Sequence, residues 1–143
     1  MKTTNKSLSS ISLFSGAGGM DLGFKNAGFK VCWSNDLDAK ACDTYKSNFS
    51  STNECGPIEE FKRELKSYSD IDCVFGGPPC QGFSVAGKMD LNDPRSKLVY
   101  EFMKIVKLIR PKSFVMENVP SLATLEKFRL FRKQLIEEAI NCG

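Results

Sequence analysis

The stretch ISLFSGAGGMD (residues 11–21) decides the fold, because it joins a short apolar run to a glycine-rich turn and the start of a helix. Glycines let the backbone turn tightly and let a ligand approach the main chain. Outward from this stretch, short apolar runs alternate with helical patterns along the chain. Such alternation is typical of a parallel sheet wound with helices. The sequence therefore predicts an α/β fold, a mostly parallel sheet with helices on both faces.

Individual elements follow from the same pattern. Strands are expected at residues 11–14, 30–34, 73–76 and 113–117, with a weaker one near 56–58. The apolar runs CVFGG and FVME indicate strands covered on both faces. Helices are expected at 38–49, 96–109 and 125–140, and their apolar stripes predict core positions. In the last helix the stripe consists of Phe128, Phe131, Leu135 and Ile136.

The ends of the chain carry their own signals. Residues 1–8 are polar, and we expect them to form a flexible arm. Residues 9–143 are then expected to form the N-terminal part of a single domain. Residues 141–143 form a helix-stop signal that would normally lead into another strand. No strand follows, so we expect a domain that is incomplete at its C-terminal end.

Composition excludes several classes of protein. The 143 residues carry a net charge of +3 and six cysteines, with no histidine and no CxxC pair, which disfavours a zinc site. No secretion signal and no membrane-spanning run is present. The expected setting is a reducing cytoplasm. Without histidine, catalysis would use carboxylates, cysteine or lysine.

Asp36 lies 20 residues after Gly16, at the end of the second expected strand. At that position a carboxylate accepts hydrogen bonds from ribose hydroxyls in nucleoside-binding α/β domains. The dinucleotide pattern GxGxxG fails, because Asp21 stands in place of its third glycine. The pattern indicates a nucleoside cofactor other than a nicotinamide; a purely structural turn is the alternative.

The loop GGPPCQGFS (residues 76–84) places Cys80 after two prolines that stiffen the backbone. Fixed backbone and partial exposure favour a nucleophilic thiolate. For the other thiols, at Cys32, Cys42, Cys73 and Cys142, the sequence predicts small buried side chains. Glu117 ends the next parallel strand, so it is expected in the same cleft as Cys80. A solvated strand-end carboxylate is the alternative for Glu117.

These motifs together resemble those of the cytosine-C5 DNA methyltransferase family. FSGAGGMDLGF (14–24) is similar to the family's cofactor turn, GGPPCQGFS (76–84) to its catalytic motif and MENV (116–119) to its glutamate motif. AGKMDLNDPRSKL (86–98) resembles its catalytic loop, so the resemblance spans residues 9–143. It implies a Rossmann-like fold that uses S-adenosylmethionine, with double-stranded DNA as the partner and no metal.

The resemblance also implies roles for single residues. Cys80 would attack C6 of a flipped-out cytosine, and Glu117 would bind its exocyclic amine and N3. The implied cofactor residues are Phe14, Gly16, Gly18, Gly19, Met20, Asp36, Leu37, Ile58, Pro79 and Leu98. The implied contacts to the DNA are Gln81, Ser84, Lys88, Arg95 and Asn118. Two positions depart from the family pattern: Pro57 replaces an aspartate and Leu37 replaces an aromatic residue.

The family's target-recognition region has no counterpart here. We therefore expect the chain to be inactive alone and to need the missing part, from a second polypeptide or a longer chain. A tRNA cytosine-C5 methyltransferase, a noncatalytic subunit or remnant, and, least favoured, a small-molecule methyltransferase remain alternatives. The target sequence and a role in restriction-modification or as an orphan or phage enzyme stay open.

Overall fold

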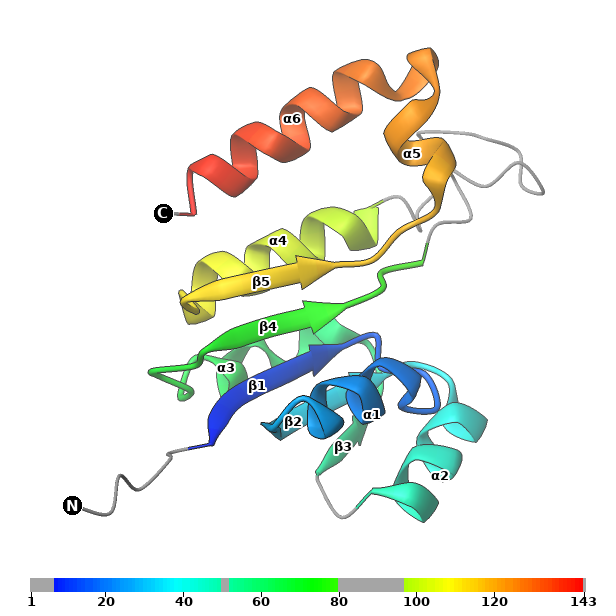
Figure 1. The fold of residues 1–143 in the computed structure, drawn as a ribbon, viewed down its shortest axis with the longest axis vertical. Coiled ribbons are helices and arrows are strands. Elements are labelled where there is room, and N and C mark those ends of the chain that lie inside the picture. Colours follow the sequence, from blue (N-terminus) through cyan, green and yellow to red (C-terminus); the bar gives the residue numbers. More distant parts are fainter. Residues whose placement is uncertain (1–6, 50–51, 80–96, 143) are drawn as a thin grey trace.

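A five-stranded parallel sheet forms the centre of the protein (Figure 1). The computed structural model describes residues 7–49, 52–79 and 97–142. The strands are β1 (Leu8–Leu13), β2 (Phe29–Asp36), β3 (Asn53–Cys55), β4 (Cys73–Gly76) and β5 (Ser113–Met116). Their order is β3-β2-β1-β4-β5, and every neighbouring pair is parallel. The predicted α/β class is confirmed.

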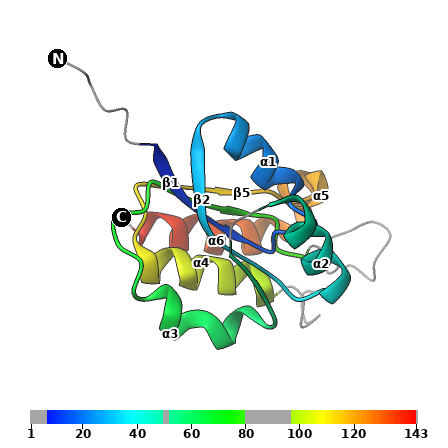
Figure 2. The same cartoon turned by 90° about the horizontal axis from the view of Figure 1, so that it is seen from below.

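Helices cover both faces of this sheet, as expected. Seen from below, α1 lies on one side, and α3 and α4 lie on the other (Figure 2). The α-helices are α1 (Gly19–Asn26), α2 (Ala39–Asn48), α3 (Lys62–Leu65), α4 (Lys97–Ile109), α5 (Pro120–Thr124) and α6 (Arg129–Ile140). Two 3-10 helices, η1 (Ile58–Phe61) and η3 (Glu126–Phe128), precede α3 and α6. None of the helices in the described ranges is long and apolar enough to cross a membrane.

The main core lies between the sheet and α4. The stripe predicted for α4 is buried, with Phe102 and Ile105 fully inside, and it packs with Trp33 of β2. On the opposite face, Phe24 of α1 stacks on Phe75 of β4 with ring centroids 3.7 Å apart. Full burial of one such side chain is worth roughly 1.5–3 kcal/mol, so both contacts hold the helices against the sheet.

Two strand boundaries differ from the sequence-based expectation. β1 begins at Leu8, inside the range expected for the arm. The third strand lies at Asn53–Cys55 rather than near 56–58, because Pro57 offers no backbone N–H to continue the ladder and the 3-10 helix begins at Ile58.

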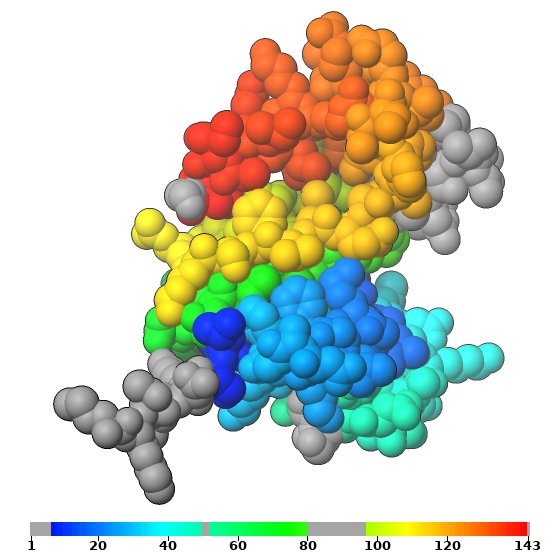
Figure 3. Space-filling view, in the orientation of Figure 1, coloured from blue at the N-terminus to red at the C-terminus, as the bar shows by residue number. Residues whose placement is uncertain are grey.

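The prediction that both faces of β5 are covered is wrong. β5 is the last strand of the sheet in the described part of the chain, and Val115 keeps 48% of its surface exposed. In the space-filling view the yellow surface of β5 lies open beside α1 (Figure 3). Ile136 was likewise expected in the core, but it is 59% exposed. It points away because α6 buries only the neighbouring stripe of Phe131 and Leu135 against α4 and β5.

Candidate active site

The glycine-rich turn between β1 and α1 adopts the left-handed backbone conformation that the glycines predict. Gly16 has φ 54° and Gly18 has φ 93°, and Phe14 shares this region at φ 55°. The N–H of Gly18 donates to the carbonyl of Ser15 at 3.0 Å, which closes the turn. A β-carbon at Gly18 would also overlap the rings of Phe49 and Tyr45. Both the positive φ and this lack of space therefore require glycine here.

Asp36 holds this turn from the end of β2. Its Oδ2 accepts from the N–H of Gly16 at 2.7 Å, and its Oδ1 accepts from the N–H of Asp38 at 2.9 Å. Asp38, the residue directly before α2, caps that helix by accepting from the N–H of Ala41 at 2.9 Å. The carboxylate predicted to bind ribose therefore lies directly beside the glycine turn.

Asp21 is a buried acid to which sequence reasoning gave no role beyond excluding a dinucleotide motif. Its Oδ2 accepts from the hydroxyl of Ser12 at 2.9 Å and its Oδ1 from the hydroxyl of Tyr45 at 2.8 Å. Burial raises the pKa of Asp21 above its ordinary value, although both hydrogen bonds act to lower it. Its place three residues before the apolar Phe24, on the inward face of α1, was the signal that could have revealed it.

A cavity of about 420 Å³ opens at the carboxyl ends of the strands, where parallel sheets bind ligands. Six of the predicted cofactor residues line it: Phe14, Asp36, Leu37, Ile58, Pro79 and Leu98. The wall also includes five residues not predicted to bind the cofactor: Asn35, Gly56, Pro57, Glu59 and Gly77. The other four predicted cofactor residues are not among those that line the cavity: Gly16 and Gly18 lie in the neighbouring turn, and Gly19 and Met20 begin α1.

Asn35 shapes this cavity although it was not predicted. Its side-chain amide donates to the carbonyls of Glu54 and Gly56 at 2.9 Å each, so the chain leaving β3 is fixed beside β2. Asn35 is 1% exposed. A polar amide near the end of β2 was the available signal, because a buried amide needs hydrogen-bond partners.

Glu117 and Asn118 tie the end of β5 to the chain that follows β4. The N–H of Glu117 donates to the carbonyl of Gly76 at 2.9 Å, and Asn118 Nδ2 donates to the carbonyl of Pro78 at 3.3 Å. A β-carbon on Gly77 would lie 3.1 Å from Oε2 of Glu117. Glu117 therefore lies against Gly77, a residue of the cavity wall.

The remaining predicted site residues, Cys80, Gln81, Ser84, Lys88 and Arg95, lie outside the described residues. Within the described part of the chain, no cluster of three potential metal ligands occurs.

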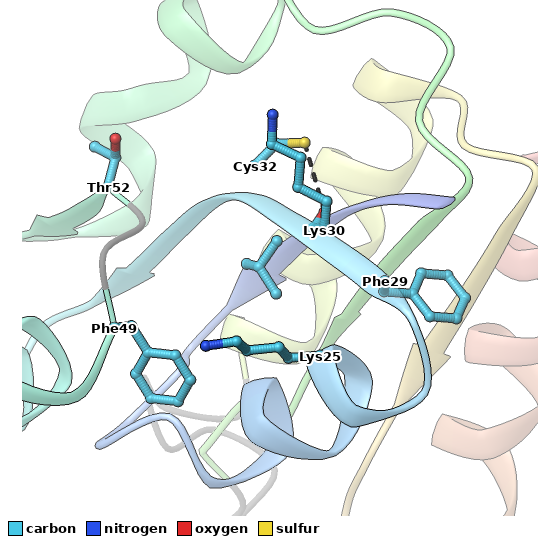
Figure 4. Close-up of a pocket in the computed structure, with 7 residues that line it drawn as sticks. Lys25, Phe29, Lys30, Cys32, Phe49 and Thr52 are labelled. Atoms are coloured by element: carbon cyan, nitrogen blue, oxygen red, sulfur yellow. Dashed lines mark hydrogen bonds between the residues drawn. The ribbon is translucent and has the colours of Figure 1, made fainter. Parts of the chain in front are cut away.

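A second cavity of about 490 Å³ lies elsewhere on the molecule (Figure 4). It is lined by Lys25, Phe29, Lys30, Val31, Cys32, Phe49 and Thr52, none of which is a predicted site residue. All four of its β2 residues lie in the first half of that strand, away from the carboxyl ends of the sheet. The candidate site therefore stays with the cavity beside Asp36.

Comparison with known proteins finds relatives that are all methyltransferases among those described below. A Type II methyltransferase of Haemophilus parahaemolyticus, M1.HphI, is 45% identical over 132 residues, which cover 82% of this chain and 34% of that protein. M.XorII of Xanthomonas oryzae is 42% identical over 140 residues, covering 93% of this chain and 33% of that protein. The chain thus spans about a third of the length of these two relatives.

Solved structures agree with the fold. A protein described as a prophage-encoded DNA modification methyltransferase from E. coli superposes with a TM-score of 0.78 at 35% identity, covering 94% of this chain and 38% of that one. DNMT2 of Spodoptera frugiperda superposes with a TM-score of 0.68 at 27% identity, and the match covers 95% of this chain and 41% of that one. The family model for C-5 cytosine-specific DNA methylase matches residues 8–143. The chain belongs to the C-5 cytosine-specific DNA methylase family.

Proposed function

We propose that this chain is the cofactor-binding and catalytic part of an S-adenosylmethionine-dependent DNA cytosine-5 methyltransferase. The observation that carries the proposal is the position of Glu117. Its carboxylate lies against Gly77, and Gly77 also lines the cavity beside Asp36. A base held by Glu117 and a methyl donor held in the cavity would thus be neighbours, as group transfer requires.

The cavity suits a nucleoside cofactor. Its volume of about 420 Å³ lies in the range of small-molecule sites. Phe14, Leu37, Ile58 and Leu98 supply apolar walls, and Asp36 supplies a carboxylate that can accept from hydroxyl groups. S-adenosylmethionine would supply an activated methyl group there.

The proposed reaction uses a thiol and a carboxylate. Cys80 forms a bond to C6 of the cytosine, and Glu117 stabilises the electron density that moves into the ring. C5 then takes the methyl group, and the electron pair of the broken bond stays on the sulfur of the cofactor. Solvent takes up the C5 proton, and the electrons of that C–H bond expel Cys80 as a thiolate. Free Cys80 returns, so the thiol acts as a true catalyst.

DNA would enter at the same edge. The target base must leave the helix to reach Cys80, because its ring atoms are inaccessible while stacked. Gln81, Ser84, Lys88, Arg95 and Asn118 are proposed to hold the backbone and position the base. A nucleophilic thiol and a DNA substrate both suit a reducing cytoplasm.

Activity is proposed to need sequence beyond these 143 residues, in a longer chain or a second polypeptide. The support is length, because the chain spans 34% and 33% of two relatives that align with most of it. Exposed Val115 on β5 and exposed Ile136 on α6 would be buried by such a part.

Mechanism-based trapping tests the proposal. The completed protein is incubated with S-adenosylmethionine and a DNA duplex that carries 5-fluorocytosine, where fluorine blocks the final elimination. We expect a covalent adduct that maps to Cys80 and is lost in Cys80→Ser. A tRNA substrate offered in parallel should remain unmethylated. Methyl transfer by Cys80→Ser, or transfer to tRNA alone, would contradict the proposal.

A further inference from the structure

Two cysteines flank Asp36 from different elements. Cys42, in the first turn of α2, directs its thiol at the carbonyl of Asp36, with Sγ 3.5 Å from the oxygen. Cys55, the last residue of β3, is the register partner of Asp36 in the sheet. Figure 1 shows α2 beside β3. Both cysteines therefore lie beside Asp36, and the Cys55 thiol is near enough to Cys42 to raise its pKa.

The two thiols differ in exposure. Cys55 is exposed, whereas Cys42 is 1% exposed. Burial and the neighbouring Cys55 thiol raise the pKa of Cys42 to about 12, so Cys42 stays protonated while Cys55 is reduced. An accessible thiol beside a sheltered one is the arrangement of an attacking and a resolving cysteine.

We propose that Cys42 and Cys55 form a reversible disulfide, driven by glutathione disulfide, that weakens cofactor binding in the adjoining cavity. The effect on binding rests on the proposed function, whereas the disulfide site itself does not. Transient, regulatory disulfides are the kind found in reducing compartments.

The chemistry takes two exchange steps. The Cys55 thiolate attacks one sulfur of glutathione disulfide, which forms a mixed disulfide and releases one glutathione thiolate. Cys42 then loses its proton and attacks the Cys55 sulfur, which forms the Cys42–Cys55 bond and releases the second glutathione. The protein loses two hydrogens and two electrons, and one glutathione disulfide becomes two glutathiones. Excess reduced glutathione reverses both steps.

Asp36 connects this bond to the cavity. Its carbonyl accepts from Cys42 and from the N–H of Gly56 at 2.9 Å, and both Asp36 and Gly56 line the cavity wall. Oxidation removes the thiol proton that Cys42 donates. A covalent link would also pull the start of α2 toward the end of β3. Both changes act on the backbone that positions the Asp36 carboxylate.

The experiment uses protein carrying Cys80→Ser, because the proposed nucleophile would react with the oxidant. The protein is equilibrated with glutathione disulfide. The sulfur linkages are mapped by peptide mass spectrometry, and the affinity for S-adenosylmethionine is measured by calorimetry. We expect a Cys42–Cys55 linkage and about tenfold weaker binding, a normal size for coupling between sites. Dithiothreitol should restore both values.

Three variants sharpen the test. Cys55→Ser, an exposed change, and Cys42→Ala should each bind the cofactor equally well before and after oxidant. Cys32→Ser should keep the full response, because the Cys32 thiol bonds the Lys30 carbonyl on the first half of β2. Linkage of Cys55 to glutathione alone, or a mapped Cys42–Cys55 bond with unchanged affinity, would overturn the inference. Reduced protein that fails to bind the cofactor would instead refute the proposed function, and mapping would still decide the disulfide.

Discussion

The carboxylate of Asp36 accepts a 2.7 Å hydrogen bond from the backbone N–H of Gly16, 20 residues earlier in the chain. This bond joins the end of β2 to the turn that follows β1. The same carboxylate also accepts from the N–H of Asp38. Asp36 therefore has a fixed orientation at the wall of the cavity before any ligand arrives.

Replacing the charge at Asp36 should weaken the cofactor site. Asp36→Asn removes a charged acceptor, and hydrogen bonds to charged groups are worth about 1.5–3 kcal/mol. We expect S-adenosylmethionine to bind on the order of ten- to a hundredfold more weakly in calorimetry. Asp38→Asn is the matched control, because asparagine caps a helix as well as aspartate does. Equal losses in both variants would speak against a specific role for Asp36.

Loss of the Tyr45 hydroxyl should destabilise the fold. Tyr45→Phe keeps the ring that packs on Phe49 but removes one of the two side-chain hydrogen bonds to buried Asp21. The free energy of unfolding in urea should fall by about 1.5–3 kcal/mol. Tyr100→Phe is the control, since its hydroxyl bonds Gln134 at an exposed site. That change should cost less than about 0.5 kcal/mol.

Glu117→Gln should separate catalysis from cofactor binding. The amide keeps the shape of the side chain but cannot transfer a proton to N3 of the cytosine as electron density moves into the ring. In the completed enzyme, methyl transfer should fall on the order of 10²- to 10³-fold. Affinity for the cofactor should stay unchanged. Glu126→Gln is the control, because its side chain is 81% exposed and pairs with nearby Arg129. It should leave both quantities unaltered.

Asp72 should make stability depend on pH in the acid range. Hydrogen bonds from Lys112 and the N–H of Ser9 lower the pKa of Asp72 from 3.8 to about 2. Because the folded pKa is depressed, the carboxylate stabilises the fold above pH 3.8, and this contribution is lost as pH falls toward 2. Asp72→Asn should be less stable than wild type at pH 6 and should match it near the acid end.

Urea unfolding at a series of pH values would measure that difference. Asp43→Asn, at an exposed position of α2, serves as the control and should follow wild type throughout. A gap between Asp72→Asn and wild type that stays constant down to pH 2 would contradict the assignment.

Two glycine-to-alanine substitutions should change the free energy of unfolding in opposite directions. A β-carbon at Gly76 would overlap the main chain of Leu13 on the neighbouring strand, so Gly76→Ala should cost at least about 1–3 kcal/mol. Gly23 lies in α1, and a β-carbon there meets nothing within 4 Å. Gly23→Ala should therefore stabilise the protein by about 0.5–1 kcal/mol. Thermal unfolding of both variants is the measurement.

Local signals in the sequence predicted most of the fold. The apolar run of β4 and the stripe of α4 were both confirmed, because each depends on residues that are neighbours along the chain. The boundary of β3 was missed, since Pro57 and the carbonyls held by Asn35 decide it. The stripe of α6 predicted burial for Ile136, which depends on what packs against that face rather than on periodicity.

The sequence by itself determined the class of fold, the glycine turn, Asp36 and the strand-end position of Glu117, because spacing along one chain carries that information. Only the tertiary structure decided that β5 is the last strand among the described residues, that Asp21 is buried and accepts from Ser12 and Tyr45, and that Cys42 and Cys55 both lie beside Asp36. Those facts depend on contacts between residues from different elements. No periodic pattern encodes such contacts, because they arise only when the elements pack.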